Sequence, residues 1–369
     1  MHRLSVTTQH YYELIGDICY YKLKASMNKI YSLQILRAFA AWLVVYHHYM
    51  LLFHNFESKT LIGNVMSTRG SFGVDLFFIL SGLVMYLVSE NKTITATSFF
   101  VKRVTRVAPA YWFYTSILIV LLFIFPKEFG FTNFNYESLI KSYFLIPSQN
   151  PSGIGLFPLL TVGWTLIFEM VFYTMLAISI GISKKHSVLI CSFLVIFSSL
   201  LFPEGNLYST VLGSSQICQF LYGFAIGFYL RSNVFKKLNN LFSLYKQAFV
   251  LLTVALIMLT GVLGFGLIHK TIAASCIVLS CILLDSKFSY SNWLAKFLIK
   301  SGDYSYSIYL SHFLVLGVLL HYTGNNFSML QEFGILLTMT VVVHFISYFS
   351  YKYIENGVVP RVLNRVFIQ

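Results

Sequence analysis

A succession of ten apolar segments constrains this chain more than any other feature of its sequence. They cover residues 31–53, 71–89, 110–126, 158–182, 187–202, 209–230, 248–265, 267–284, 304–321 and 330–351. A helix needs about 20 apolar residues to cross a bilayer, and most of these segments approach that length. Hydrophobic residues make up 57% of the 369 and charged residues 11%, more apolar surface than a water-soluble fold can bury. The sequence therefore predicts an all-α, polytopic membrane protein with about ten transmembrane helices.

The lysines and arginines between these segments are distributed unequally. In alternate connections, 20 lie on the side of the N-terminal tail and 5 on the other side, while Arg37 falls within the first segment. Because cytoplasmic loops carry the excess of cations, both termini are expected in the cytoplasm. The net charge of +13 comes from short clusters between apolar runs, which indicates contacts with anionic lipids and no nucleic-acid partner.

The sequence divides into a membrane core with a tail at each end. The expected regions are a cytoplasmic N-terminal tail at residues 1–28, a transmembrane domain at 29–355 and a cytoplasmic C-terminal tail at 356–369. The first tail lacks the apolar stretch of a signal peptide. Met27 is an alternative start, which would leave residues 1–26 outside the native core. The connection 127–157 is the longest and is expected to shape an acceptor site.

Ionisable side chains inside the apolar segments are functional candidates, because a charge in the bilayer core costs a few kcal/mol. Arg37 and His48 are eleven residues apart, so they project from one helix face about 16 Å apart. Asp75 is expected near the depth of His48. A carboxylate beside an imidazole fixes its tautomer and raises its basicity, as a general base requires. The alternative is a polar pair that only packs two helices.

Two further histidines are expected to have structural roles. His47 is rotated by about 100° from His48 on an ideal helix, so the two rings cannot share one ligand-facing surface. His344 is expected to bond to a neighbouring helix. The five cysteines form no CxxC pair, so neither a metal site nor a disulfide framework is expected.

A basic block, Lys102, Arg103 and Arg106, lies at the cytoplasmic entrance of the third segment. Arg103 and Arg106 are three residues apart and can face one way on a helix. The phosphates of a nucleotide-bearing acyl donor such as coenzyme A would need such cations. The alternative is a set of stop-transfer charges that contact lipid headgroups.

Five blocks of the sequence resemble acyltransferase family 3. The stretch from Ser32 to His48 resembles its opening motif, an arginine and a histidine separated by ten residues. The other blocks follow in the family's order, at Gly73–Gly82, Lys102–Trp112, Trp164–Glu169 and Gly302–His312. Two positions depart from the family pattern: Ala38 replaces the usual glycine, and Glu355-Asn356-Gly357 replaces the closing Glu-x-Pro.

This resemblance implies a bacterial inner-membrane enzyme that moves an acyl group, usually acetyl, from cytoplasmic acyl-CoA to a carbohydrate hydroxyl. The acceptor would be a cell-surface or exported carbohydrate such as O-antigen, capsule or exopolysaccharide. We predict that acyl-CoA (acetyl-CoA in the simplest case) binds at Arg37, Lys102, Arg103 and Arg106, without a metal. His48, oriented by Asp75, would then activate the acceptor. The residues expected to line the substrate cavity are Ser81, Trp164, Glu169, Tyr304, Tyr306 and His312.

Another class of protein would also place ionisable groups in a membrane. A proton-coupled transporter or flippase of a lipid-linked sugar would use the same histidine and aspartate as a proton relay. The basic block argues against it, and release of coenzyme A would distinguish the two. A membrane glycosyltransferase would require acidic metal ligands such as DxD, which the sequence lacks.

Overall fold

The computed structural model of this chain describes residues 30–357 and 361, apart from 59, 92, 128, 130–135, 154, 203–208 and 326. Within this part, the secondary structure is helical and includes no strand. Nine of its helices are long and apolar enough to cross a membrane, or ten when one bent pair counts as a single span. The predicted all-α membrane architecture is confirmed. The tail 1–28 and residues 358–360 and 362–369 of the C-terminal tail lie outside the description.

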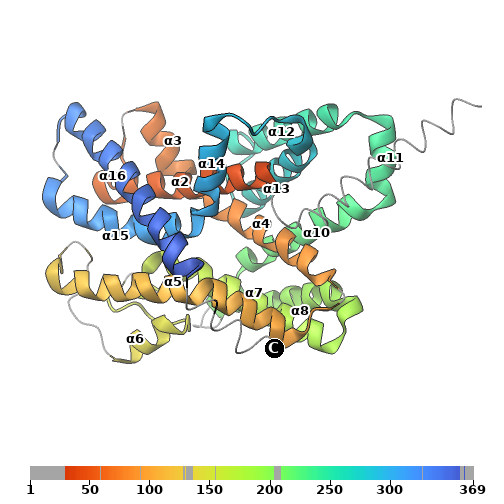
Figure 1. Ribbon diagram of the computed structural model, residues 1–369, viewed down its shortest axis with the longest axis horizontal. Coiled ribbons are helices and arrows are strands. Elements are labelled where there is room, and N and C mark those ends of the chain that lie inside the picture. Colours follow the sequence, from red (N-terminus) through yellow and green to blue (C-terminus); the bar gives the residue numbers. More distant parts are fainter. Residues whose placement is uncertain are drawn as a thin grey trace, which may run out of the picture. The chain divides into compact units, whose positions relative to one another are not determined.

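The long helices follow the predicted segments in order (Figure 1). They are α2 (Tyr31–His54), α4 (Phe72–Ser89), α5 (Ala96–Ile124), α7 (Trp164–Ile182), α8 (Ser187–Leu201), α10 (Gln219–Arg231), α12 (Leu244–Thr260), α13 (Leu267–Leu284), α15 (Ser305–Thr323) and α16 (Met329–Ser350). Shorter helices connect them: α3 (Leu61–Arg69), α6 (Tyr136–Tyr143), α9 (Ser209–Leu212), α11 (Asn233–Leu241) and α14 (Trp293–Asp303). A π-helical turn, η5 (Tyr351–Glu355), continues α16, and a 3-10 turn, η1 (Thr161–Gly163), precedes α7.

Several predicted boundaries are wrong where a helix extends past its apolar part or is interrupted. The third span was expected from residue 110, but α5 begins at Ala96, where the Thr95 side chain caps it by accepting from the Ser98 amide. The seventh was expected to reach residue 265, but α12 ends at Thr260 because Gly261 adopts a left-handed φ of 80°. The sixth segment, predicted at 209–230, agrees with one candidate span over Thr210–Arg231, which contains α9, a 3-10 turn at Ser215–Cys218 and α10. The outer connection contains α6, which was not expected.

The chain divides into two compact units. The first unit contains the chain up to Phe39, Asp75–Asn91 and Gln219–Gly302. Inside it, α12 packs against α13, and α4 crosses α10 at two glycines. A Cβ on Gly82 would lie 2.0 Å from the Phe220 carbonyl oxygen, and one on Gly223 would lie 2.3 Å from that of Ile79. The backbones can approach this closely only because neither residue has a side chain.

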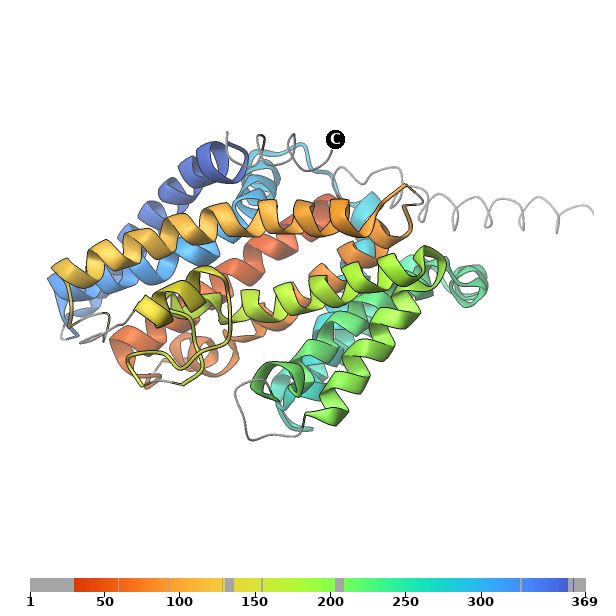
Figure 2. The ribbon, with the colours of Figure 1, turned by 90° about the horizontal axis from the view of Figure 1, so that it is seen from below.

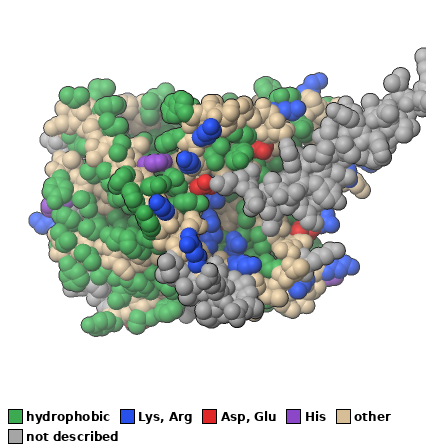
Figure 3. Space-filling view, viewed as in Figure 1, with side chains coloured by type: hydrophobic (Ala, Val, Ile, Leu, Met, Phe, Trp, Pro, Cys, Tyr) green, Lys and Arg blue, Asp and Glu red, His purple; other side chains and the backbone are tan. Residues whose placement is uncertain are grey.

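The second unit contains Ala40–Val74, Lys92–Cys218 and the chain from Asp303 onward. Inside it, α5 runs along α15, and α7 lies beside α8 (Figure 2). The α16 helix packs on α15 and exposes Leu337, Val341 and Phe345, which are spaced at four-residue intervals along one face. Hydrophobic side chains cover much of the surface over α15 and α16 (Figure 3). Such a stripe is stable in contact with lipid and unfavourable in water.

Candidate active site

A pair of histidines from α2 and α15 is the central feature of the site. The Nδ1 atom of His48 lies 2.9 Å from the Val44 carbonyl oxygen and 3.3 Å from Nε2 of His312. The Nδ1 atom of His312 lies 3.2 Å from the carbonyl oxygen of Ile308, and His312 is fully buried. Each imidazole is thus anchored to the carbonyl four residues earlier in its own helix.

These contacts determine which ring nitrogens carry protons. A carbonyl oxygen can only accept, so Nδ1 of each histidine donates to its helix carbonyl when the ring is neutral. Nε2 of His312 is then an acceptor, and the Nδ1–H of His48 is shared between it and Val44. The lone pair of His48 is consequently on Nε2, which is the nitrogen able to take a proton from a substrate.

His312 is held in place by the residues around it on α15. The Tyr309 hydroxyl donates to the Val162 carbonyl oxygen at 2.6 Å and lies 2.9 Å from the Thr165 hydroxyl. Its ring lies 5.9 Å from that of His312. Tyr309 and Thr165 are buried, so α15 is tied to the start of α7 by bonds protected from water.

His47 has a different environment from its neighbour. Its Nδ1 lies 3.0 Å from the carbonyl oxygen of Met66 on α3, and its ring lies 4.8 Å from that of Phe56. The adjacent imidazoles therefore contact different elements, as expected for side chains about 100° apart on a helix.

Asp75 is buried in the first unit among polar partners from α10 and α13. One of its oxygens accepts a hydrogen bond from the amide of Gln219, which also donates to Thr271 at 3.0 Å. The other oxygen lies 3.9 Å from the ammonium of Lys270. The partner that the structure gives His48 is His312, and the orientation of His48 by Asp75 stays a prediction. Sequence reasoning missed Gln219 and Lys270, although a lysine within an apolar segment was a visible signal.

The basic block lies on the first turns of α5, inside the helix and not before it. Lys102 and Arg106 are exposed, and Arg103 is partly buried with its guanidinium 5.9 Å from the Phe99 ring centroid. The Nε atom of Arg103 is buried and has no hydrogen-bond partner among the described residues. A buried donor of this kind is costly unless an acceptor reaches it, so Arg103 fits an anionic ligand. Arg37 is partly buried on α2, eleven residues before His48.

A second group of polar residues joins α5, α7 and α15. The Tyr306 hydroxyl donates to the Val107 carbonyl oxygen at 2.8 Å, and Tyr306 interacts electrostatically with Arg106, Glu169 and Glu355. Glu169 accepts a hydrogen bond from Tyr173. Glu169, Tyr306 and Arg106 are therefore close enough to interact electrostatically, and whether they line a substrate cavity stays a prediction.

Glu355 is a member of this group that sequence reasoning left out of the site. It ends the π-helical turn η5 and accepts a hydrogen bond from Ser307. Single π-helical turns often occur at functional positions. Its place in the closing motif was the signal in the sequence.

The remaining predicted cavity residues lie in other surroundings. The Tyr304 ring lies 5.7 Å from that of His344, in an aromatic cluster with Tyr348 and Tyr351. Trp164 begins α7, and Ser81 lies on α4 beside Gly82. Whether these residues line a substrate cavity stays a prediction.

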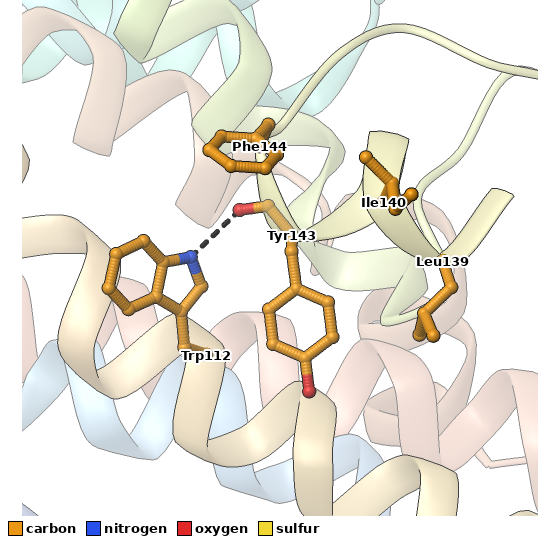
Figure 4. A pocket seen from close by; sticks show the side chains of 5 residues that line it. All are labelled: Trp112, Leu139, Ile140, Tyr143 and Phe144. Atoms are coloured by element: carbon orange, nitrogen blue, oxygen red, sulfur yellow. Dashed lines mark hydrogen bonds between the residues drawn. The ribbon is translucent and has the colours of Figure 1, made fainter. Parts of the chain in front are cut away.

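The structure also contains an open pocket that none of the predicted residues lines. It measures about 380 Å³ and lies between α5 and α6, with Trp112, Leu139, Ile140, Tyr143 and Phe144 around it (Figure 4). The Trp112 indole donates to the Tyr143 carbonyl oxygen at 2.8 Å. The residues around it include one phenol, that of Tyr143, and no histidine or carboxylate, so we place the chemistry at the histidine pair. Among the described residues, no three potential metal ligands gather into a site.

A bundle of membrane helices with a histidine pair and a basic helix start defines a polytopic membrane enzyme with a candidate general base. The chain matches a family described as "Acyltransferase domain" over residues 30–349 and belongs to it. It is therefore a multi-pass membrane acyltransferase. A relative named exopolysaccharide production protein ExoZ, from Rhizobium meliloti (strain 1021), is 28% identical over 261 residues, or 68% of this chain and 78% of the relative. No solved structure matches the chain.

Proposed function

We propose that this protein transfers an acetyl group from cytoplasmic acetyl-CoA to a hydroxyl of an exported carbohydrate. The observation that carries the proposal is the His48–His312 pair, which leaves Nε2 of His48 as a proton acceptor within an acyltransferase domain. The relative ExoZ is named for exopolysaccharide production, which supports a polysaccharide as the acceptor. A carbohydrate outside and a donor inside would place the protein in a membrane that borders the cytoplasm, which we propose is the cytoplasmic membrane of a bacterium.

His48 acts as the general base in this mechanism. Its Nε2 takes the proton of the acceptor hydroxyl while that oxygen attacks the thioester carbonyl carbon. The new C–O bond forms, the C–S bond breaks, and the imidazolium returns the proton to the departing sulfur. The Nδ1–H bonds to Val44 and His312 hold the ring in one orientation through both proton transfers and stabilise the imidazolium between them.

The basic block binds the donor. The 3′-phosphate and diphosphate of coenzyme A carry several negative charges, which Lys102, Arg103 and Arg106 complement at the start of α5. The unpartnered Nε of Arg103 supports this assignment, since a phosphate oxygen would satisfy it. Arg37 is the further cation that we assign to the donor, three helical turns before His48.

Release of coenzyme A by the purified full-length protein in lipid nanodiscs tests the proposal. The acceptor is deacylated oligosaccharide released from the exported polysaccharide of the producing strain, and a thiol reagent reports free coenzyme A. The wild type is expected to release coenzyme A only with the acceptor present and to add the mass of one acetyl group to it. His48→Ala should lower this rate at least about 100-fold, which is typical for loss of a general base.

The adjacent histidine provides the matched control. His47→Ala removes the same side chain from the same helix, where it contacts α3, and should retain at least half of the wild-type rate. A protein that moves the oligosaccharide across the membrane without releasing coenzyme A would contradict the proposal. Equal losses in His47→Ala and His48→Ala would contradict the role of His48.

A further inference from the structure

A second polar cluster lies where α2 ends and α16 begins. The carboxylate oxygen Oε1 of Glu332 lies 3.0 Å from Nε2 of His54 and accepts a hydrogen bond from the Tyr49 hydroxyl at 3.2 Å. The same His54 nitrogen lies 3.4 Å from the Tyr49 hydroxyl. This cluster includes neither His48 nor His312, and the proposed acyl-transfer mechanism does not use its side chains.

The cluster has unused hydrogen-bonding capacity that is open to solvent. Both bonds to Glu332 are made by Oε1, and among the described residues neither Oε2 of Glu332 nor Nδ1 of His54 has a hydrogen-bond partner. The side chain of His54 is 24% exposed and that of Glu332 is 35% exposed. An ionised carboxylate offers about four acceptor positions, so Glu332 can bind further hydroxyl groups without losing its present partners.

Aromatic rings border the same polar groups. The ring of Phe327 lies 5.7 Å from that of His54 and 6.1 Å from that of Phe53. Phe53 in turn stacks on Tyr49 at 4.8 Å. Phe327 is partly exposed, so one aromatic face remains available beside the carboxylate. A sugar ring has an apolar C–H face and a rim of hydroxyls, and an aromatic ring beside a carboxylate complements both.

The cluster is near the proposed base and on the side away from the donor residues. His54 follows His48 by six residues on α2, a rise of about 9 Å, whereas Arg37 precedes His48 by about 16 Å. His54 also projects about 120° away from His48 around the helix. A saccharide at Glu332 would therefore have to extend around α2 to reach His48, from the end opposite the end where acyl-CoA is assigned.

We propose that Glu332, His54 and Phe327 bind the carbohydrate acceptor. Glu332 accepts hydrogen bonds from one or two sugar hydroxyls, His54 contributes Nδ1, and Phe327 packs against the ring. The inference deepens the proposed function by adding the location of the acceptor to it.

Acceptor kinetics and direct binding together test this proposal. Glu332→Gln keeps an oxygen for Tyr49 and His54 and removes the charge. In nanodiscs, it should raise the KM for the deacylated oligosaccharide at least about tenfold, with the donor KM unchanged. Saturation-transfer NMR with the same oligosaccharide and no donor should show a matching loss of binding, and Phe327→Ala should reduce the signal too. The thermal midpoint of Glu332→Gln should stay within about 2 °C of the wild type.

Glu137→Gln is the matched control. Glu137 is an exposed carboxylate with a basic partner, Lys141, whose hydrogen bond and charge lower the pKa of that carboxyl and keep it ionised. Its neutralisation should leave both the acceptor KM and the NMR signal unchanged.

Each combined outcome gives a decision. A wild-type acceptor KM or undiminished NMR binding in Glu332→Gln would overturn the acceptor site, even if acyl transfer is confirmed. If Glu332 had a purely structural role, Glu332→Gln would lower the thermal midpoint and change the KM of donor and acceptor alike. This result would also overturn the acceptor site. Oligosaccharide binding that depends on Glu332, in a wild type that releases no coenzyme A, would refute the proposed function and retain the site. No oligosaccharide binding by the wild type would overturn the site.

Discussion

His48 and His312 show how a helix can specify the protonation of its own side chains. Each uses Nδ1 to bond the carbonyl four residues earlier, at Val44 and Ile308. This local bond requires no partner charge, so it fixes the tautomer inside a membrane at little cost. The pair differs from a base oriented by a carboxylate, because the second acceptor for His48 is a neutral ring.

We predict that His312 contributes by positioning His48 and not by touching the substrate. His312→Ala removes an acceptor of the Nδ1–H bond, so the His48 ring gains freedom. The kcat for acyl transfer should fall about 10- to 100-fold, the range found for partners that orient a functional histidine. The KM values for donor and acceptor should change less than about threefold.

His312→Gln provides the conservative counterpart. A glutamine oxygen can occupy the position of Nε2, so this variant should recover a measurable part of the lost kcat. Steady-state kinetics in nanodiscs measure both variants. A loss confined to the acceptor KM would show that His312 binds substrate instead.

Arg103 should act on donor binding alone. Arg103→Gln removes the cation but keeps a polar side chain near Phe99, so the KM for acetyl-CoA should rise about tenfold, as for loss of one charge-assisted hydrogen bond. Arg103→Lys should show an intermediate value, because an ammonium binds phosphate as a point charge without the fork geometry. An unchanged donor KM in Arg103→Gln would assign the residue to lipid headgroups or helix packing.

Sequence spacing places residues on one helix face better than it identifies their partners on other helices. Arg37 and His48 follow from one spacing on one helix, because eleven residues return to the same face. The contact between His48 and His312 joins residues 264 positions apart, which no local pattern specifies. Asp75 was paired with His48 from equal depth in the membrane, and its described partners, Gln219 and Lys270, come from segments whose adjacency the sequence does not contain.

At the level of helices, hydropathy predicts the apolar interior of a span but not its ends. The α5 helix continues 14 residues before the predicted start, because Lys102, Arg103 and Arg106 are good helix formers that solvate its first turns. The α12 helix ends before Gly261 because the backbone of Gly261 is left-handed, although the apolar run continues to residue 265. A hydropathy window responds to composition, whereas caps and left-handed residues terminate helices.

The crossing of α4 and α10 gives a prediction for an element. Gly82→Ala would place a Cβ 2.0 Å from the Phe220 carbonyl oxygen, and backbone cannot move away as a flexible side chain can. Overpacking of this kind costs about 1–3 kcal/mol, so the thermal midpoint of the purified protein should fall by several degrees.

Gly334→Ala is the control for that substitution. Gly334 also lies in a helix, α16, and a Cβ there meets nothing within 4 Å. Because alanine is the better helix former by about 1 kcal/mol, this variant should be as stable as the wild type or more stable. Equal destabilisation by both substitutions would contradict the prediction that Gly82 is required for the close approach of α4 to α10.

At the level of the whole molecule, the number of spans depends on one bent pair. The α11 and α12 helices are bent by 105° relative to each other, and they reach the length and hydropathy of a membrane span only as a pair. Counted as one span, the pair brings the total to ten, and an even number places both termini on the same side. The unequal distribution of lysine and arginine predicts that this side is the cytoplasm.

Cysteine accessibility in intact cells tests this orientation. In a variant without native cysteines, Asn325→Cys lies in the exposed connection between α15 and α16, which is expected outside. Lys185→Cys lies in the exposed connection between α7 and α8, which is expected in the cytoplasm. A membrane-impermeant maleimide should label position 325 in intact cells and position 185 only after permeabilisation. The reverse pattern would place Lys102, Arg103 and Arg106 outside, away from cytoplasmic acyl-CoA, and would thereby remove the donor site proposed here.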